Sequence, residues 1–256
     1  MNLWYLLLYQ PLVNALIGFY QLFGNLGWAI IGLTFSLRLL LLPLTWPALR
    51  AAQKMRQLAP KLEKLRKKYK NDRQKLAQAQ VELYRSVGIN PLAGFLPQII
   101  QILILIALFQ AFRHVLAGNG AIDKLNQVLY SILKLDPAAK LNLRFFYLDL
   151  TRPDLIKIGG HNWPGLFLFA SAGAQFLSAK LMMASSKVQQ KLARKTPQKS
   201  DDFAAMMQTQ SLYLFPLMTI FIGLSFPSGL VLYWLTFSLF NLIQQVIINK
   251  KYGGKK

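Results

Sequence analysis

The stretch GWAIIGLTFSLRLLLLPL, residues 27–44, contains one charged side chain, Arg38, among almost entirely apolar neighbours. An α-helix of this length covers about 27 Å, close to the thickness of the hydrocarbon layer of a bilayer. Arg38 lies roughly 12 Å from the Trp46 end of this helix, which is far for a guanidinium to reach the headgroups. The stretch predicts a membrane-spanning helix with a buried cation, and partial snorkelling with local thinning of the bilayer is the alternative.

Four runs without Asp, Glu, Lys or Arg make up about half of the chain, at residues 1–37, 86–112, 158–179 and 203–249. Each is long enough for the roughly 20 residues of one crossing. The last run has 47 residues, with the turn-forming Phe226-Pro227-Ser228-Gly229 at its midpoint, so it predicts two spans. A soluble bundle would show polar residues every third or fourth position, and these runs do not. We therefore expect five spans.

Residues 3–23 are apolar but carry Gln10, Asn14 and Gln21, and neither flank has a charge to orient them. A helix in the plane of the interface and a full span both remain open. No basic residue precedes this stretch, so a cleavable secretory signal is not expected.

The charges of the connecting segments predict the orientation. Residues 46–90 hold 12 basic side chains against three acidic ones, residues 185–208 hold five against two, and the tail from Lys250 holds four against none. Residues 116–163 hold six against four. Basic segments stay on the cytoplasmic side, so we expect a multi-pass inner-membrane protein with its N-terminus outside and its C-terminus in the cytoplasm. The net charge of +21 thus reports orientation, and sequence-specific nucleic-acid binding is not expected.

The expected fold is an all-α polytopic membrane protein, a bundle of five transmembrane helices with a hydrophilic groove. Its predicted parts are an interfacial amphipathic helix (1–24), a first span (25–46), a basic cytoplasmic helical hairpin (47–90), a second span (91–115), an external loop (116–163), a third span (164–184), a cytoplasmic loop (185–208), a fourth span (209–226), a fifth span (229–249) and a basic tail (250–256).

The predicted hairpin carries an apolar stripe on each arm. Leu58, Leu62, Leu65 and Tyr69 are spaced by four, three and four residues, Asn71-Asp72 interrupts the pattern, and Leu76, Leu83 and Tyr84 resume it. The two stripes could pack together while the charged backs face water or anionic headgroups.

Enzyme chemistry is not expected. No predicted span contains Asp or Glu, the chain has no cysteine, and His114 and His161 lie at a span end and in the external loop. Neither HExxH nor GxSxG occurs. We expect no catalytic residue, no cofactor and no metal site.

Neutral polar side chains occur in several spans, among them Thr34, Gln98, Gln101 and Gln175. Each alone is explained by hydrogen bonds between helices. Together with Arg38, which has no carboxylate partner in any span, they predict a hydrophilic groove inside the bundle.

Three motifs, in this order, carry a resemblance to a known family: Leu33-Thr34-Phe35-Ser36-Leu37-Arg38 with Pro43, Asn90-Pro91-Leu92-Ala93-Gly94-Phe95-Leu96-Pro97 through Gln101, and Phe226-Pro227-Ser228-Gly229-Leu230 through Leu232-Tyr233-Trp234 with Asn241 and Gln244-Gln245. The chain resembles the YidC/Oxa1/Alb3 family of membrane protein insertases over nearly its whole length. Phe95 departs from the cysteine usual at its position, the tail is short for ribosome binding, and a large periplasmic domain before residue 27 is not expected.

The resemblance implies that Arg38, Gln101 and Trp234 line a groove open to the cytoplasm and the lipid, and that the arginine receives the polar or acidic end of a client. It also favours the interfacial placement of residues 3–23. The implied partners are nascent membrane proteins and the lipid bilayer, with the Sec translocon and the ribosome as further candidates. The hairpin residues expected to contact clients or partners are Arg50, Lys54, Lys61, Lys64, Arg66, Lys67 and Lys68. A small-solute channel or carrier using the same cavity, or a structural scaffold, is the alternative function.

Overall fold

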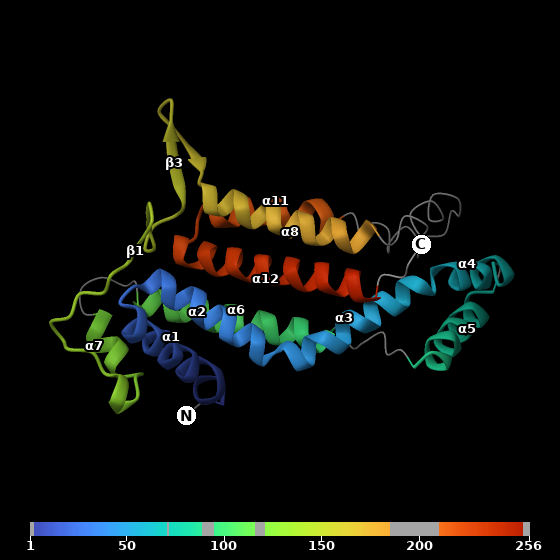
Figure 1. The fold of residues 1–256 in the computed structure, drawn as a ribbon, viewed down its shortest axis with the longest axis horizontal. Coiled ribbons are helices and arrows are strands. Elements are labelled where there is room, and N and C mark those ends of the chain that lie inside the picture. The colour runs from blue at the N-terminus through green and yellow to red at the C-terminus, as the bar shows by residue number, and fades with distance from the viewer. Residues whose placement is uncertain (1–2, 71, 89–94, 116–120, 185–209, 253–256) are drawn as a thin grey trace. The chain divides into compact units, whose positions relative to one another are not determined.

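The computed structural model of the chain describes residues 3–70, 72–88, 95–115, 121–184 and 210–252. The described part is mostly helical (Figure 1). It divides into two compact units. Unit 1 holds Met1–Leu40, Ile99–Ala174 and Pro216–Phe240, and unit 2 holds Leu41–Gln98, Gln175–Phe215 and Asn241–Lys256.

Two helices of the described part, Tyr5–Phe23 and Ser228–Tyr252, are long and apolar enough to cross a membrane. The number rises to three if the helices on either side of Leu41 are counted as one broken span. Ile99–Phe112, Leu166–Leu181 and Leu212–Gly223 are shorter apolar helices. A helical membrane protein is therefore the right class, and the bundle of five spans stays a prediction.

Helices occupy each segment that the sequence predicts to span. They are α2 (Leu26–Leu40), α6 (Phe95–Val115), α8 (Leu166–Ala184), the π-helical turn η4 (Gln210–Leu214) followed by α11 (Phe215–Gly223), and α12 (Ser228–Tyr252). The predicted boundary at residues 46–47 falls inside a helix, because α3 runs over Leu42–Gln57 with Pro47 in its interior. The predicted cytoplasmic loop 185–208 lies outside the described residues.

In unit 1, the first two helices pack against each other as a hairpin (Figure 1). A π-helical turn η1 (Tyr5–Tyr9) leads into α1 (Gln10–Phe23), and Gly24 ends α1 in a left-handed conformation with φ of 66°. Asn25 then begins α2, because its Oδ1 accepts hydrogen bonds from the N–H groups of Gly27 (2.9 Å) and Trp28 (3.3 Å).

The polar side chains of α1 bind the segment that follows α7 (Ala121–Asn126). Asn14 Oδ1 accepts from the N–H of Tyr130 at 2.6 Å, and Asn14 Nδ2 donates to the carbonyl of Val128 at 3.1 Å. Gln10 donates to the same carbonyl at 3.1 Å, and Gln21 donates to the carbonyl of Leu133 at 3.2 Å. The side chains that raised the question of an interfacial helix thus hold α1 against residues 128–133.

Two antiparallel hairpins interrupt the predicted external loop, and the sequence analysis did not predict them. The strands β1 (Arg144–Phe145) and β2 (Leu148–Asp149) form one, and β3 (Leu155–Ile158) and β4 (His161–Pro164) form the other. Gly159 and Gly160 connect β3 to β4 with φ values of 59° and 81°. Positive φ at both central residues is the requirement of a type I′ turn, which matches the twist of the paired strands.

A buried carboxylate begins α8. Asp154 is 1% exposed, and its Oδ2 accepts a hydrogen bond from the N–H of Leu168 at 2.8 Å while its Oδ1 accepts one from the hydroxyl of Tyr147 at 2.8 Å. The Tyr147 oxygen in turn accepts from the N–H of Leu166 at 2.8 Å. Burial, followed by the bond to Asp154, raises the pKa of Tyr147 to about 12, so its hydroxyl remains a donor at neutral pH.

The start of α12 is fixed to residues 149–152. The N–H groups of Ser228 and Gly229 donate to the carbonyls of Arg152 (2.7 Å) and Leu150 (3.2 Å), and the Ser228 hydroxyl donates to the carbonyl of Asp149 (2.8 Å). These bonds satisfy donors that the first turn of a helix leaves unpaired.

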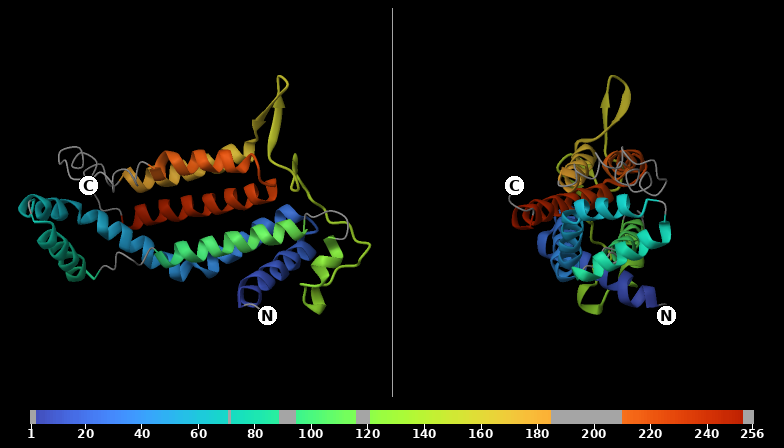
Figure 2. Two further views of the ribbon diagram at one scale, coloured as in Figure 1. Left: turned by 180° about the vertical axis from the view of Figure 1, so that it is seen from behind. Right: turned by 90° about the vertical axis from the view of Figure 1, so that its right-hand side faces the viewer.

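In unit 2, α4 (Ala59–Lys68) and α5 (Arg73–Ser86) fold back on each other (Figure 2). Leu58 and Leu62 form an apolar cluster with Leu83 and Tyr84, so residues from both predicted stripes meet. The backbone N–H of Lys75 donates to Asp72 Oδ1 at 3.0 Å and begins α5. This bond, followed by the Lys75 side chain, lowers the pKa of Asp72 below its usual value.

Candidate functional site

Arg38 lies near the end of α2 in unit 1, and its side chain is 8% exposed. The residues around it come from two other helices, α6 and α12, which are far from α2 in the sequence. Arg38 Nη2 donates a hydrogen bond to Gln101 Oε1 on α6 at 2.6 Å. Gln101 Nε2 donates onward to the hydroxyl oxygen of Tyr233 on α12 at 2.6 Å. These two bonds form a chain from cation to amide to phenol.

An aromatic ring covers the guanidinium. Arg38 Cζ lies 3.7 Å from the ring centroid of Phe237, one helical turn after Tyr233 on α12. The negative face of the ring attracts the cation, and the attraction grows where water is removed. Arg38 is therefore packed between one amide and one ring.

The site carries an uncompensated positive charge within the described part of the chain. The ion pairs among the described residues join Lys67 to Glu63, Lys75 to Asp72 and Arg152 to Asp149, and none involves Arg38. A buried cation without an anionic partner is costly, and a guanidinium has five N–H donors to satisfy. The arrangement can therefore bind an anion.

Thr34 and Trp234 are also predicted to line the groove, but their contacts lie elsewhere. Thr34 is buried one turn before Arg38, and its hydroxyl donates to the carbonyl of Ile30 in its own helix at 2.6 Å. Trp234 packs edge-on against Phe226, with 6.2 Å between ring centroids, and Phe226 packs against Phe109. Neither side chain belongs to the hydrogen-bonded chain of Arg38, Gln101 and Tyr233.

For the other two predicted groove residues, Gln98 and Gln175, the structure gives no position relative to Arg38. Gln98 lies in α6, and its side chain is outside the described part of the chain. Gln175 lies in α8 and falls in unit 2, whereas Arg38 falls in unit 1. Their place in a groove stays a prediction.

The basic residues predicted to meet clients lie on α3 and α4, and all but the half-buried Arg66 are exposed. Lys67 pairs with Glu63 at 2.9 Å, and the Lys68 ammonium lies 5.1 Å from the ring of Tyr69. Burial raises the pKa of Tyr84, and the charge of Arg66 partly opposes that rise.

The sequence analysis missed Tyr233 and Phe237 as site residues. They are four residues apart on one helix, so both point to the same face, and neutral aromatic and phenol groups are the partners left to an arginine without carboxylates. Trp234 follows Tyr233 and turns about 100° away from it. The spacing from Tyr233 to Phe237 was the signal available in the sequence.

Apolar helices of membrane-spanning character, together with a buried arginine on neutral partners, define an α-helical membrane protein. The chain belongs to the family described as 60Kd inner membrane protein, whose model matches residues 18–255. The resemblance identified in the sequence is thereby confirmed.

Relatives match the chain over nearly its whole length. The membrane protein insertase YidC of Syntrophobacter fumaroxidans is 33% identical over 247 residues, which is 96% of this chain and 38% of that protein. The proteins of the same name from Wolinella succinogenes and Helicobacter pylori are 33% and 34% identical, covering 96% and 93% of this chain and 38% and 35% of their own lengths. The chain thus spans somewhat more than a third of these curated relatives.

Proposed function

We propose that this chain is a membrane protein insertase. It receives a client segment in a hydrophilic groove and releases the apolar helix of the client into the lipid. The names of its relatives support this proposal. The driving force is the burial of the client's own apolar surface, at about 25 cal/mol per Å². No catalytic residue and no energy source of its own is part of the mechanism.

One observation carries the proposal: Arg38 is buried and rests on neutral partners. An acidic group on a client would supply the missing negative charge, and the attraction is stronger at reduced dielectric than in water. The membrane potential adds to this attraction for acidic segments moving outward. Arg38 is therefore the proposed docking point for the translocated end of a client.

The proposed groove is completed by Gln101, Thr34, Gln98, Gln175 and Trp234, in a bundle of five spans that opens toward the cytoplasm and the lipid. The N-terminus lies outside and the C-terminus in the cytoplasm. In this proposal the hydroxyl of Thr34 keeps its bond to the carbonyl of Ile30 and offers its oxygen to a client as an acceptor. The basic residues of α3 and α4 meet clients first, or contact the Sec translocon or the ribosome.

The test compares Arg38→Ala with Arg38→Lys in proteoliposomes. We expect the alanine variant to insert clients with acidic translocated ends about tenfold less than wild type, because the attracting charge is lost. Lysine keeps the charge without the planar fork, so that variant retains part of the activity. Protease protection of the translocated end measures insertion.

The matched client carries Asn and Gln in place of its Asp and Glu, and its insertion should depend far less on Arg38. Equal insertion of the acidic client by wild type and the alanine variant would contradict the proposed mechanism. Flux of small solutes through client-free proteoliposomes would instead support a channel or carrier.

A further inference from the structure

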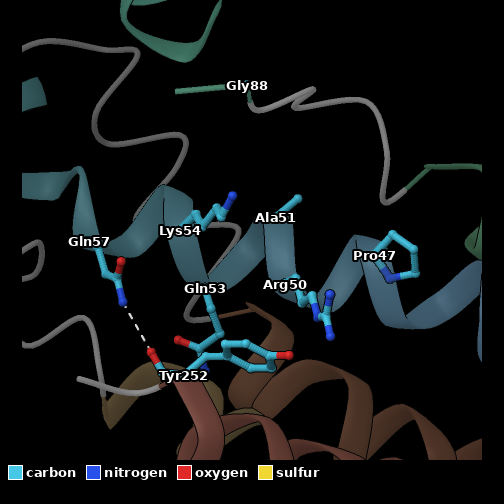
Figure 3. Close-up of a pocket in the computed structure, with 8 residues that line it drawn as sticks. All are labelled: Pro47, Arg50, Ala51, Gln53, Lys54, Gln57, Gly88 and Tyr252. Carbon is cyan, nitrogen blue, oxygen red and sulfur yellow. Dashed lines mark hydrogen bonds between the residues drawn. The ribbon is translucent and has the colours of Figure 1, made fainter. Parts of the chain in front are cut away.

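A pocket of about 390 Å³ lies along one side of α3 in unit 2 (Figure 3). α3 contributes Arg50, Gln53, Lys54 and Gln57 to its lining, and Tyr252 comes from the end of α12. Among the described residues, the lining holds two cations and three neutral polar groups and no carboxylate. This chemistry suits an anionic ligand.

Arg50 is held in place by aromatic rings. Its Cζ lies 4.9 Å from the ring centroid of Tyr252 and 5.8 Å from that of Trp46. Figure 3 shows the Tyr252 ring beside Arg50, and Gln57 Nε2 donating to the Tyr252 carbonyl at 3.0 Å. Ring faces attract a cation without using its N–H donors, so the planar fork remains available for two parallel bonds to a phosphate.

The side of the pocket that Gln53 forms is ordered by hydrogen bonds within the protein. Gln53 is 3% exposed and donates to Asn249 Oδ1, which also accepts from Gln245 Nε2 at 2.8 Å. Asn249 Nδ2 donates to the carbonyl of Leu181 at 3.1 Å. These bonds fix α3 against the ends of α8 and α12, and a preformed site loses little entropy on binding.

The surroundings of the pocket favour a lipid over a free ion. Tyr252 ends the apolar helix Ser228–Tyr252, and Trp and Tyr gather where spans meet the headgroups. Ile243, Val246 and Ile247 are exposed on the last turns of the same helix, so this part of α12 presents an apolar surface of the kind that acyl chains contact. The volume holds a headgroup but not a whole phospholipid.

We propose that this pocket binds the phosphate group of an anionic phospholipid, with Arg50 and Lys54 as its cationic ligands. The site goes beyond the proposed insertase activity and requires no client. A lipid-binding assay therefore tests it separately from insertion.

The experiment measures phospholipid retained by the full chain, purified in detergent with equal phosphatidylglycerol and phosphatidylcholine, by native mass spectrometry. Wild type should retain phosphatidylglycerol preferentially. Arg50→Gln with Lys54→Gln should lower that retention about tenfold, because two phosphate ligands are lost. Lys75→Gln with Arg85→Gln is the matched control, since it removes one Lys and one Arg from exposed positions on α5, and it should stay within about twofold of wild type.

A second pair keeps all charges. Tyr252→Leu removes the ring that holds Arg50 and should lower retention about threefold, whereas Tyr252→Phe keeps the ring and should retain the lipid. This pair decides the question if the double variant fails to fold in a thermal unfolding assay. Equal loss in the α5 control, or no preference of wild type for phosphatidylglycerol, would overturn the proposal. Displacement of the lipid by millimolar inorganic phosphate would identify a free-phosphate site and would also overturn it.

Discussion

At the scale of single residues, Arg38 is held firmly in place by neutral partners that leave its positive charge unbalanced. The amide of Gln101 and the ring of Phe237 fix where the guanidinium lies, and neither neutralises it. A carboxylate in place of Gln101 would neutralise it from within. Because glutamine and glutamate have nearly the same shape, this exchange changes the charge of the site and little else.

Gln101→Glu should therefore lower the insertion of clients with acidic ends about tenfold, because the new carboxylate competes for Arg38. Gln101→Leu removes the hydrogen bond but keeps the net charge, so it should cost about twofold. The same proteoliposome assay measures both. A glutamate variant that inserts acidic clients better than the leucine variant would show that the charge of Arg38 is not what clients require.

A second residue-scale prediction concerns Gly165, next to the cap of α8. A Cβ at this position would lie 1.7 Å from Asp154 Oδ1, so Gly165→Ala must displace a buried carboxylate from its donors. We expect a loss of about 2 kcal/mol, seen as a lower thermal unfolding midpoint in detergent. Gly173→Ala in the same helix meets nothing within 4 Å and should leave the midpoint unchanged or slightly raised. Equal shifts in the two variants would contradict this account.

At the scale of elements, the start of α5 depends on Asp72, whose Oδ1 accepts from the N–H of Lys75. Asp72→Ala should speed amide hydrogen exchange in the first turn of α5 about fivefold at neutral pH, while Asp72→Asn keeps the acceptor and stays near wild type. The pKa of Asp72 is lowered in the folded chain, so its contribution is full above the usual aspartate pKa and is lost as pH falls through the folded value. The difference between wild type and the alanine variant should shrink in acid, and an increase there would be inconsistent with a carboxylate cap.

The elements differ in how far the sequence predicts them. Runs without charged residues locate the apolar helices, because charged side chains are costly in a helix that is surrounded by hydrocarbon. The break between α2 and α3 at Leu41 comes two residues before Pro43, which lacks an N–H, yet helix resumes at Leu42 and continues past Pro47. The hairpin of β3 and β4 was missed, although Gly159-Gly160 between two β-rich runs is a known turn signal.

At the scale of the whole molecule, the basic segments predict the orientation, and the absence of cysteine makes it measurable. Asn162→Cys in the β3–β4 hairpin should react with a membrane-impermeant maleimide in spheroplasts, and Gln78→Cys on α5 should not. Both side chains are exposed, so accessibility within the protein is matched. After lysis both should react. Labelling of position 78 alone in intact spheroplasts would reverse the proposed topology.

The partners of Arg38 show why sequence alone could not complete the site. The missing carboxylates are a local property of the predicted spans, and they indicated an arginine without an acidic partner there. The family resemblance, and not a local pattern, assigned Gln101 to the same groove. Tyr233 and Phe237 reach the site only because α2, α6 and α12 come together, and this packing joins residues more than 100 positions apart. A residue pattern within one helix does not show which residues of another helix it will contact.

The hydrogen bonds between Asn14 and residues 128 and 130 set an order for the making of this protein. The ribosome adds about 5–20 residues per second, and 114 positions separate Asn14 from Val128. Because α1 is synthesised before that segment, it waits about 6–23 seconds for the backbone that completes its binding surface. It reaches its final packing only after residue 130 has been added.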